Sequence, residues 1–127
     1  MGLVSFRAGQ TITSGNFLRV TTDGFAHPAT AGNKAGATAI GVAINSAEAN
    51  DVVLVNKDYI YDGLPSLTPG EKVYLALDSG QHYTSYDAFD VALSGSTLSG
   101  MYLTELGTAI TSQKLHVQIQ LPVFINR

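Results

Sequence analysis

The sequence predicts an all-β fold, a small β-barrel or sandwich built from two related β-units with pseudo-twofold internal symmetry. Three observations support this prediction. Residues 12–20 align with residues 67–75 at an offset of 55 positions, and an Asp-Gly or Asp-Ser-Gly turn follows each copy. Short alternating or β-branched segments recur between turn residues along the chain. No segment places apolar residues at helical spacing over three turns.

The first unit is expected over residues 9–61. Its strands are expected at residues 10–12, 17–21, near 25–27, 39–44 and 51–55. The pair Asp23-Gly24 is a hairpin signal. The small, Gly-containing stretch at 28–38 predicts a mobile loop. Gly41 predicts a bulge or a close backbone approach, and residues 46–49 predict a turn or a single helical turn.

The second unit is expected over residues 64–121, in the same order. Its strands are expected at residues 72–77, 81–84, 101–110 and 114–121. Gly107 takes the place of Gly41, and residues 85–99 form a longer polar and aromatic loop. The strand at 114–121 alternates throughout. Leu115, Val117, Ile119 and Leu121 would share one face, and Lys114, His116, Gln118 and Gln120 the other.

The two ends flank a single β domain over residues 9–121. Residues 1–8 alternate weakly, with Val4 and Phe6 on one side, which fits a short strand, a frayed end or an arm that becomes a strand on meeting a partner. Pro122 ends the last strand, and residues 122–127 form an apolar tail. Phe124 and Ile125 in this tail would either contact a partner or cover the domain's own core.

Composition limits the classes of function. The formal charge of −3 lacks the basic stripe of a nucleic-acid binder. Charged residues form 13% of the chain, against about 25% in typical domains, which favours a protein that assembles with others. No cysteine is present for disulfides or thiolate metal sites. No signal peptide or apolar run of membrane-spanning length is evident, so a soluble protein made in the cytosol is expected.

No pattern of catalytic residues appears in the sequence. The three histidines, His27, His82 and His116, lack metal-ligand spacing. His27 and His82 follow equivalent turns, so a shared metal site about the pseudo-axis is a minor alternative. Asp87 and Asp90 lack the oxygen pattern of a calcium loop. The prediction is no enzyme, no metal and no cofactor.

Several segments resemble the capsid decoration (cement) proteins of tailed bacteriophages. The similar segments are residues 8–18 leading to Asp23-Gly24, Ile40-Gly41-Val42-Ala43, Leu67-Thr68-Pro69-Gly70 with Val73-Tyr74-Leu75, Leu106-Gly107-Thr108-Ala109, and residues 114–121. The resemblance covers nearly the whole chain. The insertion at 85–100 and the apolar tail at 123–125 depart from the family's pattern.

The resemblance implies a structural protein of the virion. Such a protein is made in the host cytoplasm, binds the major capsid protein on the outside of the head, often as a homotrimer, and stabilises the shell against internal pressure. It contacts neither nucleic acid nor membrane. We expect contacts with the capsid or between subunits at Val4, Phe6, Arg7, Phe124 and Ile125. An arm at residues 1–7 could add a strand to an edge of the capsid protein.

Two other functions remain open at this point. The six tyrosines and the loop at 85–99 would suit a receptor- or glycan-binding module of a phage tail. A hydrolase with a scattered site would depend on Asp87, Asp90 or His82. Co-sedimentation with capsids separates the first possibility from a decoration protein, and activity lost on replacing one of these residues would identify the hydrolase.

Overall fold

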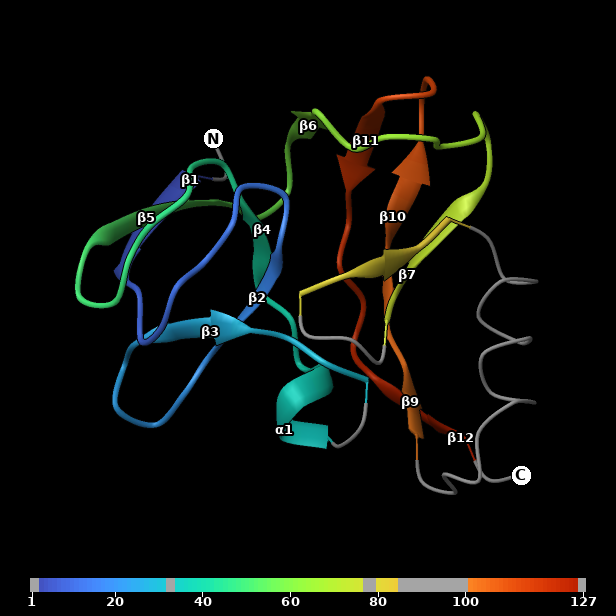
Figure 1. Cartoon of the computed structure of the whole chain (residues 1–127). Coiled ribbons are helices and arrows are strands. Elements are labelled where there is room, and N and C mark those ends of the chain that lie inside the picture. Colours follow the sequence, from blue (N-terminus) through green and yellow to red (C-terminus); the bar gives the residue numbers. More distant parts are fainter. Residues whose placement is uncertain (1–2, 32–33, 77–79, 85–100, 126–127) are drawn as a thin grey trace.

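The computed structural model describes residues 3–31, 34–76, 80–84 and 101–125, and confirms an all-β fold (Figure 1). The first sheet contains β1 (Leu3–Arg7), β2 (Phe17–Val20), β3 (Ala26–Pro28), β4 (Gly41–Ala43) and β5 (Val52–Asn56). The second contains β6 (Ile60–Asp62), β7 (Lys72–Leu75), β8 (His82–Tyr83), β10 (Glu105–Ala109) and β11 (Lys114–Val117). A two-stranded sheet pairs β9 (Met101–Leu103) with β12 (Val123–Ile125), and α1 (Lys34–Ala37) is a single helical turn.

The predicted pair of related units is visible in the strand order. The first sheet runs β1-β5-β4-β2-β3 and the second runs β6-β11-β10-β7-β8, so each strand of one unit has a counterpart at the same place in the other. Hydrogen bonds repeat as well. The amide of Gly15 donates to the Ala43 carbonyl at 2.8 Å, and the amide of Gly70 donates to the Ala109 carbonyl at 2.8 Å.

Gly41 and Gly107 mark the closest backbone approach in each unit. A Cβ atom at Gly41 would lie 2.4 Å from the carbonyl oxygen of Asn56 on β5. A Cβ atom at Gly107 would lie 2.1 Å from the carbonyl oxygen of His116 on β11. Both distances are far below van der Waals contact, so the close approach predicted at these glycines is confirmed.

The first sheet encloses its own apolar cluster, which we call the first cluster. Its members come from β2 to β5 and the connecting loops: Ala8, Ile12, Leu18, Ala26, Ala43, Ala47, Val53 and Val55. A parallel bridge between Ala8 and Ala26 joins the end of β1 to β3, at the other edge of the sheet. The sheet therefore curls toward closure around the first cluster.

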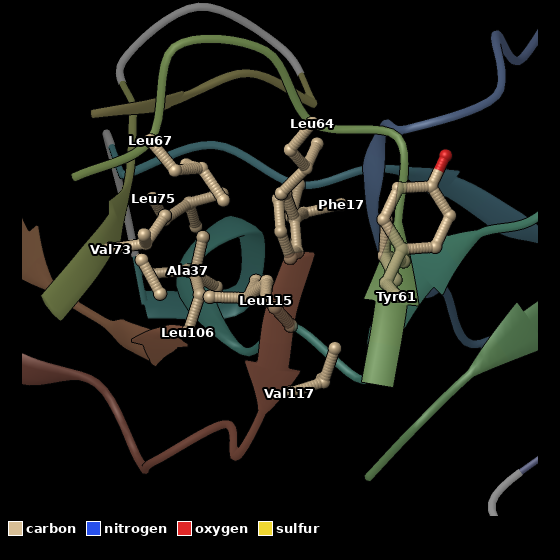
Figure 2. Close-up of a cluster of buried hydrophobic side chains, with 14 residues drawn as sticks. Phe17, Ala37, Tyr61, Leu64, Leu67, Val73, Leu75, Leu106, Leu115 and Val117 are labelled. Atoms are coloured by element: carbon tan, nitrogen blue, oxygen red, sulfur yellow. The ribbon is translucent and has the colours of Figure 1, made fainter. Parts of the chain in front are cut away.

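The second cluster is larger and draws on both units. Most of its residues belong to the second unit, including Val73, Leu75, Leu106, Leu115 and Val117 (Figure 2). Phe17 of β2 and Val42 of β4, which are opposite each other in register, also belong to it. The first unit thus presents the side of its sheet away from the first cluster to the core of the second unit.

The equivalent positions of the second unit are polar. Lys72 and Thr108 are paired in register on β7 and β10, as Phe17 and Val42 are on β2 and β4. The Lys72 ammonium donates to the Thr108 hydroxyl at 2.8 Å, and Lys72 is exposed. The two copies therefore differ at this position: Phe17 lies on a sheet face that the second cluster covers, and Lys72 lies on a sheet face that is open to solvent.

Several predicted segments differ from the structure. Residues 3–7 form β1, paired with β5, so of the alternatives given for this end the structure shows the short strand. Residues 123–125 form β12, paired with β9, rather than a tail. The expected loop at 28–38 contains α1, and residues 46–49 contain no helical turn. β11 ends at Val117, and Leu121 is 81% exposed. The loop predicted at 85–99 lies outside the described residues.

Candidate interaction surfaces

Exposed apolar side chains gather on one side of the first sheet and on the turn that leads from β5 to β6. Six of the nine large apolar residues that are exposed in the described part of the chain belong to this group: Leu3, Ile44, Val52, Leu54, Tyr59 and Ile60. Their exposed fractions run from 37% for Ile44 to 59% for Tyr59. We call this group the first apolar surface. Exposed apolar residues that adjoin one another mark interaction sites more often than scattered ones do.

Strand register explains why these side chains point outward. Val53 and Val55 of β5 are fully buried in the first cluster, so the residues between and before them, Leu54 and Val52, face away from it. Ser5 lies opposite Leu54 across the β1–β5 pair. On the other side of β5, the Ile44 amide donates to the Leu54 carbonyl at 2.9 Å. The surface thus crosses three neighbouring strands.

A groove of about 460 Å³ continues the first apolar surface toward β6. Leu3, Ile44, Tyr59 and Ile60 line it together with Gly63 and the polar residues Ser14, Asn56, Tyr61 and Asp62. Figure 2 shows the Tyr61 hydroxyl pointing away from the second cluster, and this hydroxyl lies 3.2 Å from that of Ser14. The groove is therefore lined by both apolar and polar side chains.

The buried side chain of Asn56 fixes the turn that carries Tyr59. Its carbonyl oxygen accepts a hydrogen bond from the Tyr59 amide at 2.8 Å, and its amide nitrogen donates to the Ile60 carbonyl at 3.3 Å. Asn56 is only 3% exposed. Because a buried amide holds this turn in place, Tyr59 and Ile60 are presented by a fixed backbone.

A second apolar surface lies beside the β9–β12 pair. Leu121 is 81% exposed and Val123 is 59% exposed. Together with Leu103 they border a groove of about 220 Å³, whose other lining residues are Tyr74, Glu105 and Gln120. We call Leu103, Leu121 and Val123 the second apolar surface. Ile110, exposed at the end of β10, lines neither groove.

The five predicted contact residues are distributed differently from the expectation. Val4 and Phe6 are half-buried and pack against the first cluster, so they have the core role that their terminal position did not suggest. Arg7 is exposed, and its guanidinium donates to the Asn50 carbonyl at 2.7 Å. Phe124 and Ile125 lie in β12, opposite Tyr102 and Met101. The residues of the first apolar surface carry no motif, and only the alternation of β5 could have indicated them.

The histidines have structural neighbours. The ring of His27 rests on Gly9, where a Cβ atom would lie 2.2 Å from Nε2, and Nδ1 lies 3.2 Å from the Gln10 side-chain oxygen. His82 packs edge-on against Phe17, with ring centroids 5.9 Å apart. Burial lowers the pKa of His82 below its ordinary value. The sequence equivalence of the two histidines does not extend to their neighbours, because His27 pairs in register with Arg19 whereas His82 pairs with Leu75.

Other titratable groups serve local structure. The Thr21 hydroxyl and the Phe25 amide donate hydrogen bonds to the Asp23 carboxylate, and both lower the pKa of Asp23. These bonds close the turn between β2 and β3. Within the described residues, no group of three or more His, Asp or Glu side chains is placed to hold a metal ion. Asp87 and Asp90 lie outside the described residues.

Comparisons with known proteins add no relative. Neither the models of protein families nor the curated protein sequences contain a match to this chain. Among the described residues, no helix has the length and apolar character needed to cross a membrane.

Proposed function

We propose that this chain is a structural protein that decorates the outside of a tailed-phage head and stabilises the shell. The observation that carries the proposal is the presence of two separate exposed apolar surfaces on a small β-protein. The first lies over β1, β4 and β5, and the second lies beside β9 and β12, on the other side of the molecule (Figure 1). A protein with two such surfaces can bridge two neighbours. From the resemblance of the sequence to capsid decoration proteins, we take these neighbours to be the major capsid protein and other copies of the chain.

The proposed mechanism is linkage between binding and shell stability. A protein that binds the assembled lattice and not the free capsid subunits shifts the equilibrium toward the lattice. In this proposal the second apolar surface contacts the major capsid protein, because its residue Val123 belongs to β12, the strand of the predicted contact residues Phe124 and Ile125. The first apolar surface then remains for contacts between copies of the chain. No bond is made or broken, and no cofactor takes part.

Capsid binding tests the proposal. Empty heads that lack the protein are mixed with the purified chain and sedimented. The wild-type chain should co-sediment, and the variant L121E/V123E should bind at least about tenfold more weakly, because a carboxylate buried in an apolar contact remains without a partner. I110E is the control, since Ile110 is also exposed, at 46%, but lies outside both surfaces.

Two outcomes would contradict the proposal. The first is no binding of the wild-type chain to the heads. The second is equal binding by L121E/V123E and I110E, which would show that the second apolar surface is not the contact. Binding to host cells or to a glycan array, without binding to heads, would favour the receptor- or glycan-binding module. The groove with Tyr59 and Tyr61 would then be its candidate site.

A further inference from the structure

Two grooves of the described structure share part of their lining. The first is the groove of about 460 Å³ that includes Tyr59. The second has a volume of about 280 Å³, and its polar lining includes Thr13, Asn16, Gln81 and His82. Ser14 and Gly63 line both grooves. The two grooves therefore adjoin, and together we call them the boundary trench.

The Tyr61 hydroxyl lies where the two grooves adjoin. It is 3.2 Å from the hydroxyl of Ser14, which donates to the Ile44 carbonyl at 3.0 Å. The Tyr61 hydroxyl then donates to Ser14 and keeps a lone pair that can accept from a ligand. Gly15 and Gly63 adopt φ values of 93° and 136°, and a Cβ atom on either would lie 3.6 or 3.5 Å from the Tyr61 oxygen. Because neither residue carries a side chain, this hydroxyl stays uncovered on the trench side.

The charges in the boundary trench limit the class of ligand. Among the described residues that line it, Asp62 is the one acid, and no lysine or arginine is present. Burial lowers the pKa of His82, so its ring is largely neutral at pH 7. An anionic ligand such as a nucleotide would meet a carboxylate and no cation. An entirely apolar ligand would leave the hydroxyl and amide groups without partners. A neutral ligand that carries many hydroxyls matches this lining.

The strand edge beside the trench does not favour a peptide. An extended peptide binds chiefly by adding a strand to a sheet edge. The edge strand that contributes most to the trench, β6, has only three residues. One of its carbonyls, that of Ile60, already accepts a hydrogen bond from the Asn56 side chain at 3.3 Å. The polar side chains of the trench therefore outnumber the main-chain groups that a peptide would use.

We propose that the boundary trench binds a neutral oligosaccharide. The Tyr59 ring, 59% exposed and carried on the turn that Asn56 fixes, would stack on the apolar face of one sugar ring, because the C–H groups of that face fit the negative face of an aromatic ring. The Asp62 carboxylate would accept hydrogen bonds from sugar hydroxyls. The Tyr61 hydroxyl and the polar side chains of the second groove would bind hydroxyls farther along the ligand.

This binding would be a second function beside the proposed attachment to heads. The second apolar surface, which the head proposal uses, contributes no residue to the boundary trench. Contacts between copies would then use Val52 and Leu54, the two members of the first apolar surface that line neither groove. The two functions can therefore be tested on the same chain with separate reagents.

A glycan array that carries neutral, sulfated and sialylated oligosaccharides tests the inference with the purified wild-type chain. The chain should bind neutral members of the array. The neutral glycan with the strongest signal is then titrated calorimetrically against variants. Y59A should raise the dissociation constant at least about tenfold, because the stacking face is lost. Y59F keeps that face and should bind within about twofold of the wild-type chain.

A pair of exposed carboxylates supplies a matched control. Asp62 lines the trench, whereas Asp58, exposed in the turn before β6, does not. D62A should weaken binding of the same glycan about tenfold, because it removes a charged acceptor, and D58A should leave it unchanged. Both side chains are exposed, so both variants should keep the stability of the wild-type chain in urea.

Three results would overturn the inference. The first is binding of no array member, or of sulfated and sialylated members only. The second is a neutral glycan that Y59A and D62A bind as tightly as the wild-type chain does. The third is binding of immobilised peptides through Tyr59 without binding of neutral glycans. A chain that binds heads but no glycan would leave the proposed function standing, and a chain that binds glycans but no heads would leave this inference standing.

Discussion

At the scale of single residues, His82 shows how the contact between the two units creates a titrating group. Its ring packs on Phe17, which belongs to the first unit and is fully buried. This packing removes water from the imidazole, and burial therefore lowers the pKa of His82 below the value of 6.5 in the unfolded chain. Protonation of His82 is consequently harder in the folded protein than in the unfolded one.

We expect a stability that falls in mild acid and depends on His82. As the pH drops below 6.5, the unfolded chain takes up a proton at His82 before the folded chain does, so the free energy of unfolding decreases until the folded pKa is reached. Above the unfolded pKa this group contributes no pH dependence. Urea unfolding at about pH 7.5 and pH 5 should show the decrease, and H82Q should show a smaller one. An equal decrease in both proteins would contradict the assignment.

Residue-level prediction from the sequence worked best at glycines. Gly41 and Gly107 were expected at close backbone approaches, and both have a carbonyl oxygen where a Cβ atom would lie. Val4 and Phe6 are half-buried and pack against the first cluster, and their contact with a partner stays a prediction. The sequence shows that two side chains share one side of a strand, but it does not show what lies on that side.

At the scale of elements, β5 defines the difference between the core and the first apolar surface. Val53 is fully buried and Leu54 is 43% exposed, although they are neighbours in one strand. The pairings with β1 and β4 fix this orientation, because a shift by one residue would exchange the two faces. Positions 53 and 54 of β5 therefore allow the same substitution to be compared at a buried site and at an exposed site.

We expect V53T and L54T to differ clearly in stability. Threonine at position 53 would bury a hydroxyl among apolar side chains, which should cost about 2 kcal/mol of the free energy of unfolding. Threonine at position 54 faces outward and should change the free energy by less than about 1 kcal/mol. Urea unfolding of the two variants measures the difference. Similar costs at both positions would show that the register of β5 is wrong.

The elements could be predicted from alternation, and their ends less well. Alternation continues to Leu121, yet β11 ends at Val117 and Leu121 is exposed. Local pattern extends a strand as long as apolar and polar residues alternate, whereas β6 pairs with β11 only at residues 114–116. Beyond Val117 the chain is held by single bonds, from the Gln118 amide to the Leu106 carbonyl and from the Gln120 amide to the Glu105 carbonyl. β12 was missed as a strand for a similar reason, because its partner β9 is distant in sequence.

At the scale of the whole molecule, the two units meet through non-equivalent faces. Phe17 and Val42 of the first unit enter the second cluster, while their counterparts Lys72 and Thr108 carry a polar hydrogen bond. The repeat was predictable because the two copies share turn residues and apolar positions. The contact between the units was not predicted from the sequence. The one sign of it was that the apolar Phe17 of the first copy is replaced by Lys72 in the second.

We expect two reciprocal exchanges of these pairs to have opposite effects. F17K/V42T places an ammonium and a hydroxyl in the second cluster and should destabilise the fold by more than about 5 kcal/mol, because neither group finds a partner there. K72F/T108V places apolar groups on an open face and should change the free energy of unfolding by less than about 1 kcal/mol. Denaturant unfolding compares both variants, and a stable, folded F17K/V42T would contradict the described contact.

The polar pair Lys72 and Thr108 also affects whether a further unit could dock on the second unit. The first unit lies against the second unit's interior with one apolar face, and nothing in the topology of a repeated unit would by itself stop a third from docking in the same way. Lys72 and Thr108 make the equivalent face of the second unit polar, like the outer face of a capping repeat in a solenoid. A third unit that docked in the same way would have to bury this ammonium and this hydroxyl, so the face formed by Lys72 and Thr108 is suited to contact with water.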